Sequence, residues 1–140
     1  MESTNFDTGL VSIAINGDEN RVIKFNATDT NLVVRLTEVQ ERFEKLEEKY
    51  KDTQLPTDDT KEIVKLIVEM ENEVKENLNY LFNADVYDTI FNGTSPFTLV
   101  NGKMLVERVL EAFTPILEKY IGEENKKVSK RIAKYQKAYK

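Results

Sequence analysis

The stretch that decides the fold lies at residues 10–25 and reads LVSIAINGDENRVIKF. Asn16-Gly17 stands between two runs rich in strand-forming residues, and both turn residues tolerate a positive φ, so the stretch predicts a β-hairpin. Larger apolar residues alternate with smaller ones along the first run, which predicts one buried face. Because two strands alone are only marginally stable, we expect the hairpin to pack on a helix or to pair with another chain.

Two helical patterns follow the hairpin. Apolar positions recur every three or four residues over 31–51, and again in a segment that begins near Asp59, where Asp59 and Glu62 have capping-box spacing. A loop with Pro56 separates the two segments. We expect the two apolar stripes to face each other as an αα-hairpin. The stripes consist of Leu32, Leu36, Val39, Phe43, Leu46 and Tyr50, and of Ile63, Leu66, Ile67, Met70, Val74, Leu78 and Leu81.

The second half of the chain is also largely helical. A short helix is expected over 85–91, followed by a break in which Ser95 and Pro96 predict the N-cap and first position of one turn. Asn101-Gly102 breaks the chain again.

A longer helix is then expected over 103–121, with a kink or a break at Pro115, whose ring removes one backbone hydrogen bond. A separate last helix is expected from about Glu123 to Tyr139.

These elements predict an α+β class that is mostly α, with an N-terminal β-hairpin followed by about four to five helices in a compact bundle. We expect one domain over residues 1–140. Its parts are a flexible N-terminus (1–9), the β-hairpin (10–25), a helical body (29–122) and a basic C-terminal helix (123–140).

The composition argues against most kinds of catalysis. The 140 residues include no histidine, no cysteine and no tryptophan. This excludes a cysteine nucleophile, a disulfide, the usual zinc sites and a histidine pH switch. The five glycines never have phosphate-loop spacing, and the carboxylates of 38–48 lie off the apolar stripe, as on a solvated helix face. We expect no enzyme, no cofactor and no metal site.

The net charge of −5 averages two unlike parts of the chain. Residues 1–124 hold all 25 acidic residues and 13 of the 20 basic ones, which leaves this part at −12. The last 15 residues hold the other seven basic residues and no acid, and so carry +7. Such asymmetry is typical of an interaction tail, although a tail that folds back on the acidic body fits equally well. The acidic body disfavours nucleic acid as a partner.

The feature with most functional promise is apolar. The helical stripes carry many large side chains, and the last helix has a thin stripe of its own, which together favour a module that binds a partner helix. The alternative is that all the apolar stripes pack on one another in the core of a monomer. A polar N-terminus and the absence of a long apolar run predict a cytoplasmic protein without a membrane span.

The order of elements resembles the tail assembly chaperones of long-tailed bacteriophages and prophages of Gram-positive bacteria. The likeness covers nearly the whole layout, from the hairpin to the Lys/Tyr-rich end. Its specific part is IFNGTS at residues 90–95, similar to a Phe-Gly-x-Gly-Thr pattern of that family, although only one glycine, Gly93, precedes Thr94 and Pro96 follows. The family-like turn consists of Phe91, Asn92, Gly93, Thr94 and Ser95.

The resemblance implies a partner and a place of action. The protein would bind the tape measure protein, a long helical chain rich in apolar residues, and keep it soluble until tail tube subunits polymerise around it. The tail tube protein would be a second partner, and copies of the chaperone could associate along the client. The protein would act in the cytoplasm of the bacterial host and be absent from the mature virion. A frameshifted, longer product is known for many such phages.

We expect the client to bind apolar faces at the C-terminal end, because the thin last stripe is too weak to anchor a helix wholly inside a core. The expected partner-binding residues are Phe113, Leu117, Tyr120, Val128, Ile132, Tyr135 and Tyr139.

Two alternative functions stay open. The first is a structural tail completion or connector protein that pairs subunits through the hairpin edge. The second is a regulator associated with nucleic acid, acting through the basic C-terminal helix.

Overall fold

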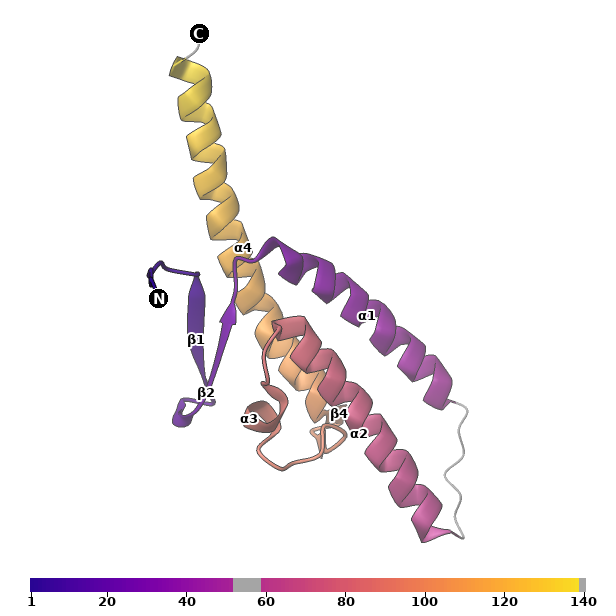
Figure 1. Ribbon diagram of the computed structural model, residues 1–140. Helices are drawn as coiled ribbons and strands as arrows, with labels where there is room; N and C mark the ends of the chain where they lie inside the picture. The colour runs from indigo at the N-terminus through magenta and orange to yellow at the C-terminus, as the bar shows by residue number, and fades with distance from the viewer. Residues whose placement is uncertain (52–58, 139–140) are drawn as a thin grey trace. The chain divides into compact units, whose positions relative to one another are not determined.

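The predicted β-hairpin opens the chain in the computed structural model (Figure 1). The structure describes residues 1–51 and 59–138, with side chains over 1–49 and 59–122. The chain divides into two compact units, Met1–Thr98 and Leu99–Lys140, which are described separately. The predicted class, α+β and mostly α with an N-terminal hairpin followed by helices, is confirmed.

The hairpin pairs β1 (Leu10–Ile15) antiparallel with β2 (Asp18–Asn26). Asn16 and Gly17 have φ values of 54° and 74°, the left-handed pair that a tight turn of the I′ kind requires. Ile23 and Phe25 of β2 are buried, while Lys24 between them and Val22 before them are exposed. The predicted turn and the predicted alternation of the two faces are both present.

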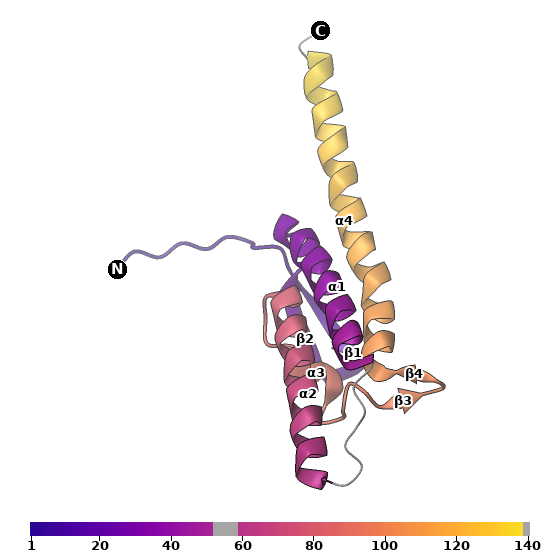
Figure 2. The same ribbon diagram turned by 90° about the vertical axis from the view of Figure 1, so that its right-hand side faces the viewer.

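Helices α1 (Thr30–Lys51) and α2 (Thr60–Phe82) run antiparallel and lie side by side (Figures 1 and 2). Asp59 is the N-cap of α2, as predicted, and its Oδ1 accepts a hydrogen bond from the Lys61 amide at 3.0 Å. The predicted αα-hairpin is therefore confirmed, although the loop with Pro56 lies outside the described residues.

The core of the first unit lies where β2 meets the last turns of α2. The rings of Phe25 and Phe82 meet edge to face, with centroids 4.9 Å apart. Burial is deepest near this contact and falls along the helix pair: α2 is buried from Val74 to Phe82 and only partly covered before Met70. The buried apolar side chains of this unit are Ile23, Phe25, Ala27, Leu32, Val39, Val74, Leu78, Leu81, Phe82, Val86, Ile90 and Phe91.

The short helix α3 (Tyr87–Phe91) lies within the predicted range 85–91. It ends at Asn92, whose φ of 49° is left-handed. The predicted single turn follows, because the Phe97 amide donates to Ser95 Oγ at 3.2 Å and the Thr98 amide donates to the Ser95 carbonyl at 3.1 Å.

The second unit begins with a small hairpin that the sequence analysis did not foresee. Strands β3 (Leu99–Val100) and β4 (Lys103–Met104) pair across Asn101-Gly102, which was expected only to break the chain. Both turn residues have positive φ, as in the first hairpin. The Lys103 ammonium lies 2.6 Å from the Glu111 carboxylate, and this hydrogen bond lowers the pKa of Glu111.

The largest correction concerns the end of the chain. We expected a kink or a break at Pro115. Helix α4 runs without interruption from Leu105 to Ala138, so the break and the separate last helix from Glu123 are wrong. The boundary predicted between 122 and 123 falls inside this helix. Proline costs a helix one amide donor, and the turns on both sides carry good helix formers that propagate past it. Thr114, next to the proline, donates its hydroxyl to the Leu110 carbonyl at 2.7 Å.

The Phe25–Phe82 contact gives a first prediction. Phe25 is 1% exposed, so Phe25→Ala should lower the free energy of unfolding by about 3–5 kcal/mol, measured by chemical denaturation. Phe25→Leu, which keeps much of the volume, should lose less. The control is Leu10→Ala on β1, where the side chain is 61% exposed and little should change. Equal losses for Phe25→Ala and Leu10→Ala would contradict the position of this core.

Candidate functional site

Six of the seven partner-binding residues expected from the sequence lie within α4 (Leu105–Ala138). Phe113 and Leu117 are 7% and 3% exposed, and Tyr120 is half-buried. The other four lie where the structure describes no side chains: Val128, Ile132 and Tyr135 on the helical backbone of α4, and Tyr139 outside the described residues. The structure thus places six of the seven on one continuous helix.

The family-like turn at 91–95 has a structural role. Phe91 is buried, and Asn92 caps α3 through its backbone amide, which donates to the Asp88 carbonyl at 2.9 Å. Gly93 has a φ of 82°, where a side chain would be strained even though the space around it is open. The Thr94 amide then donates to the Phe91 carbonyl at 2.9 Å. The glycine is needed for the backbone angle that reverses the chain.

Two polar side chains from distant elements hold the ends of α3. Asn79 of α2 accepts hydrogen bonds from the amides of Val86 and Tyr87, at 2.9 Å and 3.0 Å, and so satisfies the start of the helix. Arg21 of β2 donates from Nε to the Thr89 carbonyl at 3.1 Å and from Nη2 to the Ile90 carbonyl at 2.6 Å. Neither residue was predicted from the sequence, because nothing in its local pattern indicates a partner in another element.

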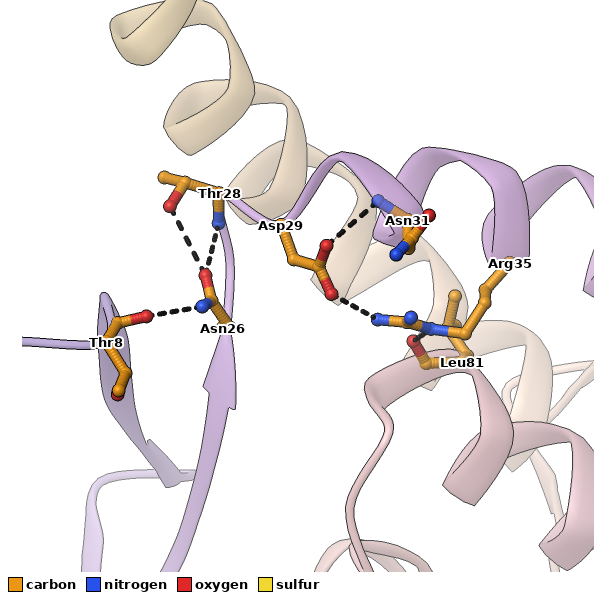
Figure 3. A network of polar contacts seen from close by, with 7 residues as sticks. All are labelled: Thr8, Asn26, Thr28, Asp29, Asn31, Arg35 and Leu81. Carbon is orange, nitrogen blue, oxygen red and sulfur yellow. Dashed lines mark hydrogen bonds and ion pairs between the residues drawn. The ribbon is translucent and has the colours of Figure 1, made fainter.

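A second polar network joins the start of α1 to the end of α2 (Figure 3). Arg35 donates from Nε to the Leu81 carbonyl at 3.1 Å, and its Nη2 lies 3.3 Å from Asp29 Oδ2. The other oxygen of Asp29 accepts the Asn31 amide at 3.0 Å. One arginine therefore satisfies a carbonyl at the end of one helix and fixes the residue that caps the other.

A third cluster bridges the two helices at their surface. The Tyr80 hydroxyl donates to Glu38, and the Arg42 guanidinium lies 4.5 Å from the centre of the Tyr80 ring. Arg42 also lies 3.7 Å from Glu38 and donates to Asn77 Oδ1 at 3.4 Å. The hydrogen bond to Glu38 raises the pKa of Tyr80, because ionisation would set a phenolate beside a carboxylate. These polar contacts link the surfaces of α1 and α2.

Three apolar side chains on the first half of α2 are exposed, and we name them the α2 patch. Val64, Ile67 and Val68 are 53%, 40% and 47% exposed and follow one another at the i, i+3, i+4 spacing of a helix face. The sequence analysis assigned only Ile67 to the stripe of α2. Val64 and Val68, four residues apart and outside the predicted stripe, were the signal that the apolar face of α2 is wider than that stripe.

Two kinds of feature are absent from the described residues. Among them, no group of three or more acidic, histidine or cysteine residues is placed so that it could hold a metal ion. No helix in the described part of the chain combines the length and the apolar content needed to span a bilayer. What the described surface does offer is apolar side chains on regular helices, at the α2 patch and at Val33 and Val34 of α1.

The two hydrogen bonds from Arg21 to the Thr89 and Ile90 carbonyls, which we call the clamp on α3, can be tested by substitution. Arg21→Lys keeps the charge but cannot reach both carbonyls in the same fork, so it should cost about 1–2 kcal/mol of stability. Hydrogen exchange should accelerate at the amides of Ile90 and Asn92, which close the turns of α3. Lys24→Gln, at an exposed position of the same strand, is the control. Unchanged exchange in Arg21→Lys would refute the clamp.

The Tyr80 cluster predicts a pH dependence. The pKa of Tyr80 lies above the ordinary 10.0, so the folded state holds this proton more tightly than the unfolded state. The stabilisation is fully present below pH 10.0 and is lost as the pH rises through the raised pKa. A pH titration of tyrosinate absorbance, compared between the natural chain and Tyr80→Phe, should give the contribution of Tyr80 alone. Glu38→Gln should return the pKa toward its ordinary value, and an unaltered titration in that variant would count against the cluster.

Comparison with known proteins adds no relative. The chain matches no family model, no curated protein and no solved structure.

Proposed function

We propose that this chain is a non-catalytic assembly factor that binds an apolar helical client, and that it acts as a tail assembly chaperone for the tape measure protein of a long-tailed phage. The proposal combines the resemblance of the sequence with the surfaces of the helices. The observation that carries it is the continuity of α4, which extends as a helix through the basic end of the chain to Ala138.

Because α4 is continuous, the sparse apolar residues near its C-terminal end can be assigned to a helix face from their spacing. Val128, Ile132 and Tyr135 are spaced by four and three residues, so on an unbroken helix they belong to one face. The same segment holds six basic residues and no acid after Glu124: Lys126, Lys127, Lys130, Arg131, Lys134 and Lys137. A narrow apolar face on a highly charged helix suits reversible binding to a client helix, because it stays soluble when the client leaves.

A chaperone that only holds its client needs a helix face that the client can reach, and it needs no reacting group. We assign this role to the face of α4 on which the spacing places Val128, Ile132 and Tyr135. In this proposal the protein works in the host cytoplasm, is displaced when tube subunits polymerise around the client, and does not enter the mature virion.

Co-expression with the tape measure protein tests the proposal. Ile132→Asp with Tyr135→Asp should lower the yield of soluble client by roughly tenfold or more, because each carboxylate would be buried without a partner against the client. Thr37→Asp with Gln40→Asp is the matched control, since it places the same two charges, three residues apart, on exposed polar positions of α1. Client that stays soluble with the first variant would show that the client binds elsewhere, and client that is insoluble with the natural chain would refute the proposal.

A second candidate, a structural tail completion or connector protein, is favoured by the first hairpin. Its sheet has only the strands β1 and β2, so each strand has an outer edge that no other described strand covers. Mass spectrometry of purified particles separates the two candidates, because a connector is retained in the virion and a chaperone is absent from it.

A further inference from the structure

The α2 patch belongs to an apolar face that is covered along only part of its length. Further along the same helix, Val74, Leu78 and Phe82 are buried, and Phe82 contacts Phe25 of the hairpin. Before Val74 the face continues as the α2 patch, where each side chain is at least 40% exposed. Val64, Ile67 and Val68 thus form one contiguous apolar strip, and contiguous exposed apolar surface is typical of interaction sites.

Opposite charges stand at the two ends of the patch. Lys61 lies one turn before Val64 and is exposed, and Glu71 lies one turn after Val68 and is half-buried. Neither makes an ion pair with another residue that the structure describes. Glu71 influences the Tyr87 ring, whose pKa is raised by burial and, to a smaller extent, by this carboxylate.

The order of these residues is self-complementary. When two copies of a helix cross antiparallel at the level of Leu66, residues equally far before and after this point lie opposite each other. Val64 of one copy then meets Val68 of the other, and Lys61 meets Glu71. Twofold symmetry repeats both contacts, so each apolar pair and each ion pair occurs twice.

We propose that the α2 patch is a docking surface for a second copy of this chain, with the two α2 helices antiparallel and Lys61 paired with Glu71 of the other copy. The charge complementarity of the patch with itself identifies the occupant. Three side chains form a small surface compared with the roughly 800 Å² per partner of a standard stable interface, so we expect a weak association. The inference is independent of the proposed client, because the client surface proposed above lies on α4.

Sedimentation equilibrium of the full chain at low ionic strength, up to about 1 mM, tests the dimer. The natural chain should show a monomer–dimer equilibrium. Lys61→Glu and Glu71→Lys should each weaken it by about tenfold, because like charges would then face each other twice. The double variant Lys61→Glu with Glu71→Lys should restore the natural Kd to within about twofold, since it only exchanges the partners.

Two features keep this test free of folding artefacts. Glu at position 61 suits the first turn of α2, where the helix dipole favours an acid, so weaker association of Lys61→Glu cannot come from loss of the helix. Lys45→Glu on the exposed face of α1 is the matched control and should leave the Kd unchanged. Val64→Ser with Val68→Ser should abolish the dimer.

Three outcomes would overturn the proposal. The first is a natural chain that stays monomeric at every concentration, including the case in which Val64→Ser with Val68→Ser lowers client solubility and the patch is therefore a client site. The second is a dimer that survives the loss of both valines. The third is a double charge exchange that remains as weak as the single variants, which would exclude the antiparallel pairing at Leu66. None of these results affects the Ile132 and Tyr135 test of the client.

Discussion

The contact between the second strand of the hairpin and the end of α2 is the constraint on which the first unit depends. A two-stranded hairpin cannot bury enough apolar surface to be stable alone. Helices α1 and α2 bury apolar surface against each other along one face only, so they also need packing from another element. Phe25 packs the hairpin on the helices, because its ring contacts the Phe82 ring edge to face where burial is deepest. The hairpin stabilises the helix ends, and the helix ends stabilise the hairpin.

The helix ends that lie in this region need hydrogen-bond partners from other elements. The last carbonyls and first amides of a helix have no partner within it, and burying them without one is expensive. Arg35 meets this demand at Leu81, Asn79 at the start of α3, and Arg21 at its end. Each of these side chains reaches across from another element. These three polar side chains therefore fix the positions of the helix ends in the first unit.

The same arrangement explains where the apolar surface is left over. The hairpin and α3 cover α2 only near its C-terminal end, so the apolar face of α2 extends beyond its cover into the α2 patch. Exposed apolar residues on rigid helices, together with a long helix with a basic end, are consistent with a protein whose partners are other proteins. The proposals of client binding and of self-association use different surfaces, so a chain could hold a client through α4 while it pairs with a copy through α2.

The sequence by itself determined the parts of this protein that local chemistry controls. Asn16-Gly17 specifies its turn through positive φ, Asp59 caps α2 through its own side chain, and the period of the apolar residues separates strand from helix. Only the tertiary structure decided the rest. Pro115 breaks no helix, Asn101-Gly102 joins two strands, and Arg21 and Asn79 find carbonyls and amides in other elements. The physical reason is range: a turn or a cap is settled within a few residues, whereas the cover of a helix face and the partner of a helix end depend on residues tens of positions away.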